Sequence, residues 1–517
     1  MDGSGSGKSA SYSIPNAFQC LGSYVFTDPK GELYDKTAGY LKSQGYDIKV
    51  LNLVNPSNSD GYNPLMHISS EIDVDVVANT IVKGQKSESG SSDPYWDDMA
   101  EMLLKALIYY LMAMRPEEEQ NLASCSELVR AANTNGGSNL LTELMNQLPY
   151  DHPARMNYKS IEIAPEKTYG SILSSLQSKL GKFDSKEIAE VTSTDTINFD
   201  DIGSKKTAVY VISSDTHKAY DFLLTIFFSQ MIQQLYNFAD ENGGRLKVPT
   251  YFILDEFANI GQIPDFDKKI STSRSRGISF SVILQNLDQL EAVYEKSYET
   301  IMGNCDTHVF LGSNSFKTVE YFSKALGEKT VFRDSKSINR DKHYHKQGLS
   351  ESDQSVARAL MTPDELRRMD NDLCIIFEKG LKPVKARKYY YFEKPIARKL
   401  QEHTLNHLEF DVGVRGKWRK YNPYNPYIPE DEEKEKIDNL KVESLDDLFE
   451  DDVSEEKTEI KKEINVEKKD LSPTVDLSDF DDAPVLPQQE DDDLYDYDLQ
   501  KELEAKFDEL FGTVDGE

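Results

Sequence analysis

Residues 2–9 have the residue types and the spacing of a loop that binds phosphate. They read Asp-Gly-Ser-Gly-Ser-Gly-Lys-Ser and match the pattern G-x-x-x-x-G-K-[ST] at every position except the first, where Asp2 stands. Glycines let successive backbone N–H groups converge on phosphate oxygens, the lysine adds a cation, and the hydroxyl binds Mg²⁺. We therefore expect ATP and Mg²⁺ to bind here, at Gly3, Gly5, Ser6, Gly7, Lys8 and Ser9. A flexible Gly/Ser terminus would have the same composition.

A second segment, residues 248–256, is an apolar run that ends in two carboxylates. It reads Val-Pro-Thr-Tyr-Phe-Ile-Leu-Asp-Glu, which is typical of a buried strand that presents Asp255 to Mg²⁺ and Glu256 to an attacking water. A strand that runs into a solvated acidic turn would look the same. Because the phosphate loop is in the same chain, we favour nucleotide hydrolysis, with Glu256 as a catalytic residue and Ser9 and Asp255 as metal ligands.

Three further polar residues are candidates for the catalytic set. Gln285 follows the apolar segment 278–284, and the carboxyl end of a core strand is where open α/β sheets place their ligands. It either orients water near the terminal phosphate or caps the next helix. Arg274 and Arg276 precede the same segment, and one of them is expected to act as an arginine finger on a neighbouring subunit's phosphate. Surface arginines on a helix are the competing interpretation.

The elements that must position these residues alternate between strand and helix. Short apolar runs rich in β-branched and aromatic residues predict strands at 23–27, 48–53, 208–212, 251–254, 278–284, 308–311 and 374–377. Helical spacings of three and four lie between them, which predicts an α/β fold with a mostly parallel sheet. From about residue 93 to residue 181 the strand signal disappears, so an inserted all-α domain is expected.

The same changes of pattern divide the chain. We predict a nucleotide-binding domain in two parts, residues 1–90 and 188–395, with an all-helical insertion at 91–187 between them. A basic and Tyr-rich linker follows at 396–429, and an acidic tail at 430–517. The tail holds 34 Asp and Glu against 10 Lys and Arg, a net charge of −24, so the rest of the chain carries −7 of the total −31. Its long charge runs predict that it is disordered on its own.

Composition excludes several classes of protein. The acidic excess argues against a chain whose whole surface wraps nucleic acid. The four cysteines have no C-x-x-C spacing, which excludes a cysteine zinc site and argues against a disulfide framework. The most apolar helical stretch, residues 100–114, contains Glu101 and Lys105 and is shorter than the ~20 residues that span a bilayer. This chain is therefore expected to have no transmembrane segment.

Two basic stretches are candidates for binding DNA. They are Lys329–Lys346 and Lys382–Lys420, and the second also contains Tyr389, Tyr390, Tyr391 and Trp418. Cationic grooves with aromatic side chains bind single strands without sequence preference. A solvated loop and a tyrosine-bearing edge strand are the alternative interpretations, which the sequence leaves equally open.

Several motifs together resemble the type IV secretion coupling proteins of the VirD4/TraG family. The phosphate loop is followed in order by segments 26–33, 62–65, 254–261, 273–278, 285–286 and 360–366, which read FTDPKGEL, YNPL, LDEFANIG, SRSRGI, QN and LMTPDEL. The resemblance covers about residues 3–393. It implies a RecA/FtsK-like P-loop ATPase that works as a homo-hexamer at the cytoplasmic face of the bacterial cell membrane.

The resemblance also implies partners. They are single-stranded DNA, the relaxase and other relaxosome proteins, and components of the type IV secretion channel. Family members begin with a membrane anchor and a strand before the phosphate loop, whereas only seven residues precede Lys8 here. We therefore expect the membrane contact to be made through a segment absent from this chain.

These observations predict a conjugative coupling ATPase that recruits the relaxase–DNA complex and drives DNA transfer. One alternative is a receptor or adaptor of the secretion channel that binds nucleotide without hydrolysing it. The other is an FtsK/HerA-like translocase that acts on duplex DNA. The Asp255–Glu256 pair argues against the first alternative, and the helical insertion with the Asn-Ile-Gly turn at 259–261 argues against the second.

Overall fold

The computed structural model describes residues 7–84, 94–132, 139–214, 220–340, 347–424 and 426, with the backbone alone at 333–340 and 347–354. Residues 1–433 form one compact unit, and residues 434–517 form a second unit, which is outside the described residues. The tail predicted at 430–517 therefore lies outside them too. Among the described residues, no helix combines the length and the apolar character needed to cross a membrane.

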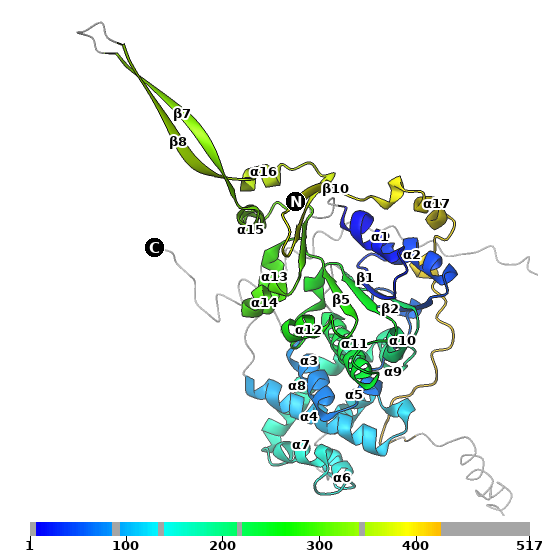
Figure 1. The fold of residues 1–517 in the computed structure, drawn as a ribbon. Coiled ribbons are helices and arrows are strands. Elements are labelled where there is room, and N and C mark those ends of the chain that lie inside the picture. The colour runs from blue at the N-terminus through cyan, green and yellow to red at the C-terminus, as the bar shows by residue number, and fades with distance from the viewer. Residues whose placement is uncertain are drawn as a thin grey trace, which may run out of the picture. The chain divides into compact units, whose positions relative to one another are not determined.

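A five-stranded sheet is the centre of the first unit (Figure 1). Its strand order is β2-β3-β1-β4-β5, and every neighbouring pair is parallel. The strands are β1 (Ser23–Thr27), β2 (Asp47–Asn52), β3 (Thr207–Ile212), β4 (Thr250–Leu254) and β5 (Ile278–Val282). All five were predicted from sequence, and the parallel α/β fold is confirmed. Because the strands are parallel, their carboxyl ends meet at one edge, where ligands bind in open α/β sheets.

Helices cover both faces of this sheet. Side chains alternate along β1: Tyr24 and Phe26 pack against α1 (Ile14–Ala17) and α2 (Glu32–Ser43), whereas Val25 points to the opposite face. That opposite face is covered by α11 (Asp221–Glu241), whose aromatic and aliphatic residues are buried along most of its length. The three inner strands β1, β3 and β4 are thus buried on both sides over nearly their whole length, whereas the edge strand β5 has only Ile278 buried.

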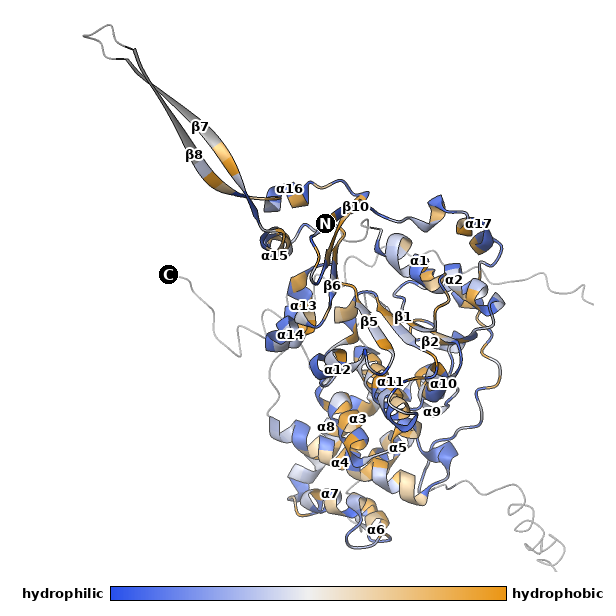
Figure 2. Cartoon of the chain, in the orientation of Figure 1, coloured by the Kyte–Doolittle hydropathy of each residue, from blue (hydrophilic) through white to orange (hydrophobic). Residues whose placement is uncertain are grey.

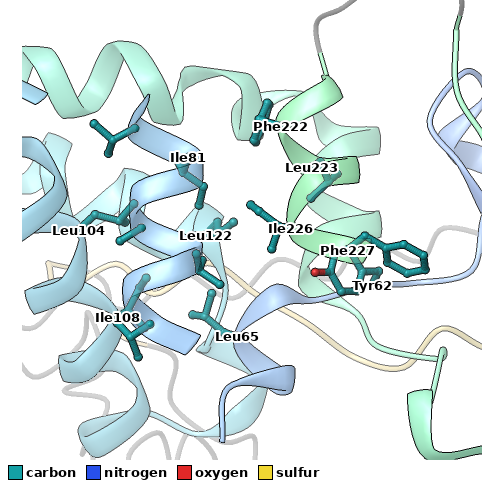
Figure 3. Packing of buried hydrophobic residues seen from close by; sticks show 14 of the residues in the cluster. Tyr62, Leu65, Ile81, Leu104, Ile108, Leu122, Phe222, Leu223, Ile226 and Phe227 are labelled. Carbon is teal, nitrogen blue, oxygen red and sulfur yellow. The ribbon is translucent and has the colours of Figure 1, made fainter. Parts of the chain in front are cut away.

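Every described element between β2 and β3 is a helix or a helical turn, as expected for the insertion. The helices are α3 (Glu71–Lys83), α4 (Pro94–Met114), α5 (Leu122–Ala131), α6 (Leu140–Met145), α7 (Pro153–Glu162), α8 (Glu166–Leu180), α9 (Lys186–Ser193) and α10 (Phe199–Ser204). Figure 2 shows the apolar stripes of α3, α4 and α8. Figure 3 shows Ile81 and Leu104 packed toward Phe222 and Ile226 of α11. The helices therefore share one core with the sheet, and the boundaries 91–187 stay a prediction.

A smaller antiparallel sheet follows in the chain. Its order is β10-β9-β6, from β6 (Thr307–Phe310), β9 (Leu373–Glu378) and β10 (Val384–Arg387). The predicted strands at 308–311 and 374–377 are thus present, but they pair with each other and not with the parallel sheet. Helix α12 (Phe266–Thr272) lies between β4 and β5, and α13 (Leu287–Tyr294) and α14 (Tyr298–Gly303) lead from β5 to β6. Helices α15 (Phe316–Leu326) and α16 (Pro363–Arg367) lie between β6 and β9.

A long hairpin occupies the first basic stretch. Strands β7 (Glu328–Arg340) and β8 (Gln347–Ala359) pair along their whole length, and Figure 1 shows them projecting from the body beside α15 and α16. The solvated-loop interpretation is therefore wrong for residues 329–340, while residues 341–346 lie outside the described residues. Cross-strand pairing was not visible in the sequence because few β-branched or aromatic residues mark these strands.

The last described segment runs back along the body after α17 (Ile396–Gln401). We call residues 403–424 the C-terminal strap. It first lies on α2, where the backbone N–H of Leu405 donates to the carbonyl oxygen of Asp35 over 3.0 Å. The backbone N–H of His407 donates to Oδ1 of Asp35 over 2.7 Å, and Nδ1 of the His407 ring lies 3.0 Å from the same oxygen.

Two arginines attach the C-terminal strap farther along. Arg415, with 8% of its side chain exposed, donates to the carbonyl oxygens of Pro56, Ser57 and Ser59 over 2.7–2.8 Å and pairs with Glu190 at 3.0 Å. Arg419 pairs with the buried Glu119 of the insertion at 2.7 Å. The described part of the predicted linker is thus bound to α2, to the turn that follows β2 and to the helices between β2 and β3.

Candidate nucleotide site

The described end of the phosphate loop, residues 7–9, lies at the carboxyl edge of the parallel sheet, beside Asp255 and Glu256. Of its predicted residues, Gly3, Gly5 and Ser6 lie outside the described residues, whereas Gly7, Lys8 and Ser9 are described. Gly7 has a φ of +73°, which favours glycine, and its carbonyl oxygen accepts from both the backbone N–H and the hydroxyl of Ser11 at 2.8 Å. A helical segment begins directly after Lys8 and continues into α1. Gly7 and Lys8 therefore lead directly into a helical segment, and a helix N-terminus of this kind favours anions.

The two carboxylates meet this loop across 246 to 248 residues of sequence. Nζ of Lys8 lies 2.8 Å from Oε1 of Glu256, and the two side chains are 11% and 17% exposed. The hydroxyl of Ser9 donates to Oδ2 of Asp255 over 3.3 Å. Glu256 has a φ of +51°, and this left-handed turn directly after β4 carries the second carboxylate to the lysine. The geometry thus unites the predicted lysine, hydroxyl and carboxylate pair.

Asp255 is partly buried directly after β4. Burial raises the pKa of its carboxyl group, while the nearby Lys8 ammonium lowers that pKa. Its backbone carbonyl oxygen accepts from the hydroxyl of Thr27, at 2.7 Å, which joins the ends of β1 and β4. Sequence reasoning missed Thr27, although its place at the end of a core strand was a usable signal.

The donor set at this point suits Mg²⁺. A hydroxyl and a carboxylate are the hard oxygen ligands that Mg²⁺ prefers, and Mg²⁺ usually keeps water and phosphate oxygens as its other ligands. Within the described ranges, no group of three or more His, Cys, Asp or Glu side chains is placed to hold a metal ion. Ser9 and Asp255 therefore fit a cation that arrives with the nucleotide.

Gln285 lies beside the same glutamate. Its Nε2 donates to Oε1 of Glu256 over 2.9 Å, so this oxygen accepts from both Gln285 and Lys8. The next residue, Asn286, caps α13, because its side-chain oxygen accepts from the backbone N–H of Gln289 at 3.0 Å. The alternative that Gln285 caps the helix is therefore wrong for its side chain.

Neither predicted arginine lies at this edge. Both precede β5 and so lie at the amino end of the strand, across the sheet from Glu256. Arg276 pairs with both oxygens of Asp240 at 3.0 Å and lies over the Tyr236 ring. The side chain of Arg274 is 94% exposed, with Asp306 3.9 Å away. A role on a neighbouring subunit's phosphate stays a prediction for both, and Arg274 is the less constrained of the two.

In the second basic stretch, Lys388, Arg415 and Arg419 contact protein, whereas Lys382, Lys385 and Arg387 are exposed. Lys388 is buried and donates to the carbonyl oxygen of Leu311 over 2.8 Å. The edge strand β10 of the antiparallel sheet ends at Arg387, so Tyr389, Tyr390 and Tyr391 follow the strand and the tyrosine-bearing edge strand is not present. Arg415 and Arg419 are held by carbonyl oxygens and carboxylates of the body. A DNA-binding role for these three residues would require breaking contacts that the structure shows.

Comparison with known proteins agrees with this geometry. The family model described as "Type IV secretory system Conjugative DNA transfer" matches residues 1–411. The conjugal transfer protein TraG of Escherichia coli is 25% identical over 428 residues, which cover 76% of this chain and 66% of that protein. Protein VirD4 of Rhizobium rhizogenes is 24% identical over 415 residues, which cover 77% and 58%. The chain thus spans less than two thirds of the length of these curated relatives.

Solved structures share the fold. The unbound conjugative coupling protein TrwBdeltaN70 superposes with a TM-score of 0.54 at 17% identity, over 74% of this chain and 82% of that one. The plasmid coupling protein TrwB in complex with the non-hydrolysable ATP analogue ADPNP gives a TM-score of 0.52 at 16% identity, over 75% and 83%. With a parallel sheet, a loop that ends in Gly-Lys-Ser and a family match over most of its length, this chain belongs to the type IV secretory system conjugative DNA transfer family.

Proposed function

We propose that the chain is the coupling ATPase of a conjugative type IV secretion system. The observation that carries the proposal is the contact of Lys8 with Glu256, beside that of Ser9 with Asp255, at the carboxyl edge of the sheet. In this proposal ATP hydrolysis drives single-stranded DNA, delivered with its relaxase, into the secretion channel. The chain acts as a hexameric ring at the cytoplasmic face of the cell membrane. Family membership supports transfer through a secretion system over duplex translocation elsewhere.

The residues have separate tasks in this mechanism. Lys8 leaves Glu256 and pairs with the phosphate oxygens when ATP enters, because a doubly or triply charged phosphate chain attracts the ammonium more strongly than one carboxylate. Glu256 is then free to accept a proton from the water that attacks the terminal phosphate. Gln285 holds the carboxylate in place through its Nε2 contact. Ser9 and Asp255 would bind Mg²⁺, which neutralises charge on the phosphates when bound.

An arginine from a neighbouring copy completes the proposed site. Arg274 is exposed and lies at the opposite edge of the sheet, so it is suited to reach another subunit's nucleotide rather than its own. Such a residue stabilises charge that develops on the transferred phosphoryl group. ATP would therefore bind between subunits, and hydrolysis would depend on assembly of the ring.

The test uses a donor cell from which the chromosomal or plasmid copy of this gene is deleted. Transfer frequency is measured after supplying the wild-type gene, Lys8→Ala, or the control Lys36→Ala on the exposed surface of α2. We expect wild type and Lys36→Ala to restore transfer and Lys8→Ala to fail, since the phosphates lose their cation. ATP hydrolysis by the same proteins is measured with and without single-stranded DNA.

Two outcomes would contradict the proposal. Full transfer with Lys8→Ala would mean that nucleotide binding at this loop is not needed. Transfer that depends on Lys8 without any ATP hydrolysis by the wild-type protein would favour the receptor or adaptor, which uses nucleotide only as an assembly signal.

A further inference from the structure

An aromatic side chain from a distant part of the sequence lies against the phosphate loop. A Cβ atom built on Gly7 would stand 2.9 Å from Cε1 of Tyr390, so the tyrosine ring directly contacts the last glycine of the loop. Tyr390 follows β10 of the antiparallel sheet, far along the chain from the loop. None of the phosphate, metal or water roles assigned above uses this residue.

We propose that Tyr390, with Phe392 stacked beside it, forms the subsite for the purine base of the bound nucleotide. The inference rests on the proposed binding of ATP at Lys8 and Ser9. A nucleotide whose phosphates occupy the loop must place its base on a nearby surface, and the described structure puts an aromatic ring in contact with that loop.

The backbone that carries the two rings is anchored on both sides. Before Tyr390, the buried Lys388 donates from Nζ to the carbonyl oxygen of Leu311 and from its backbone N–H to that of Asp372, both over 2.8 Å. After it, Tyr391 packs edge-to-face against Phe18, directly beyond α1, with 6.3 Å between ring centroids. The position of Tyr390 is thus fixed relative to the loop, as a binding residue requires.

The chemistry of the pair suits a base. The Tyr390 and Phe392 rings are stacked, with centroids 5.0 Å apart and an angle of 20° between their planes. Phe392 is 58% exposed, so the pair presents an apolar aromatic surface to water beside a polyphosphate site. Nucleobases stack on such surfaces, and stacking tolerates different bases because every base has a π face. We therefore expect ATP and GTP to use the subsite equally.

Packing alone is the competing explanation, in which Tyr390 only shapes the loop. The two explanations differ for a ligand without a base. If the ring only shapes the loop, its removal weakens inorganic tripolyphosphate and ATP alike. If the ring stacks on the base, its removal weakens ATP and leaves tripolyphosphate unchanged.

The experiment measures equilibrium dissociation constants of Mg-ATP and Mg-tripolyphosphate for the full chain. The proteins are wild type, Tyr390→Ala, Tyr390→Phe and Tyr150→Ala, an exposed tyrosine of the helical insertion. Loss of the stacking contact between the ring and the base corresponds to roughly 5- to 150-fold weaker ATP binding. We expect this loss for ATP with Tyr390→Ala only, while Tyr390→Phe keeps the ring and Tyr150→Ala binds as wild type does. Equal loss for both ligands, or no loss, would overturn the inference.

A second variant covers the case in which Tyr390→Ala does not fold. In Tyr390→Trp, ATP should quench the added indole fluorescence and tripolyphosphate should not, after subtraction of the wild-type signal from its two tryptophans. Identical responses to the two ligands would contradict stacking. Lys8→Ala separates this inference from the proposed function, because it should lose both ligands. If Tyr390→Ala binds ATP normally and the wild-type protein is an active ATPase, only the base subsite is refuted. If the wild-type protein binds neither ATP nor tripolyphosphate, the subsite and the proposed function are both refuted.

Discussion

The contact between Lys8 and Glu256 predicts that removing the glutamate charge tightens ATP binding while it stops turnover. In the structure the lysine is held by Oε1 of Glu256 at 2.8 Å, so ATP must compete with this carboxylate for the ammonium. Glu256→Gln keeps an oxygen acceptor for Gln285 but removes the negative charge. Lys8 is then released more easily, and repulsion between the carboxylate and the phosphates disappears as well.

The size of the effect follows from the geometry. A hydrogen bond to a charged group contributes about 1.5–3 kcal/mol, and such a bond is about twice as strong as its neutral counterpart. Replacing the carboxylate by an amide therefore weakens the hold on Lys8 by about 1 kcal/mol. That change corresponds to roughly fivefold tighter ATP binding. Loss of the general base should lower kcat by about 10²- to 10⁴-fold.

The assay is titration calorimetry with Mg-ATP, together with phosphate release under saturating ATP. Glu320→Gln, which makes the same chemical change on the exposed surface of α15, is the matched control and should match wild type in both measurements. If Glu256→Gln bound ATP as wild type does or more weakly, the inference that the Glu256 carboxylate competes with the phosphates for Lys8 would be wrong. If it hydrolysed ATP at the wild-type rate, Glu256 would not be the general base.

Three further changes test the fold around the site. Burial raises the pKa of Asp28 from 3.8 to about 6, so its ionised form destabilises the folded protein above that pH. Asp28→Asn should raise the free energy of unfolding by up to about 3 kcal/mol at pH 8, and in denaturant titrations this gain should fall below about 1 kcal/mol at pH 4 and vanish below roughly pH 3. Arg415→Ala should lower the free energy of unfolding by about 2–4 kcal/mol and expose the C-terminal strap to limited proteolysis. Lys417→Ala, on the exposed surface, should change that free energy by less than about 0.5 kcal/mol. Gly39→Ala would place a Cβ 1.9 Å from a carbonyl oxygen of the strap and should cost about 1–3 kcal/mol, unlike Gly170→Ala, whose Cβ meets no atom within 4 Å. A strap equally protected in all variants, or an Asp28→Asn gain independent of pH, would contradict these assignments.

Much of the fold was predictable because its signals are local. Five apolar runs predicted the parallel strands, and the loss of strand signal after about residue 93 predicted helices. The signals were weaker where pairing decides the structure. The runs near 308 and 374 look like the others, yet they form an antiparallel sheet. The strands β7 and β8, in which few residues are β-branched or aromatic, pair with each other.

The sequence by itself determined which residues of this protein have the chemistry for phosphate, metal and water: Lys8, Ser9, Asp255 and Glu256. Glycine spacing and a strand that ends in carboxylates are local properties, so they can be read without a structure. Only the tertiary structure decided that Gln285 contacts Glu256 and that Tyr390 contacts Gly7. It also decided that Arg276 pairs with Asp240 at the end of the sheet opposite Glu256. These contacts join residues 29 to 383 positions apart, and they are set by strand order and packing, which no local pattern of residues encodes.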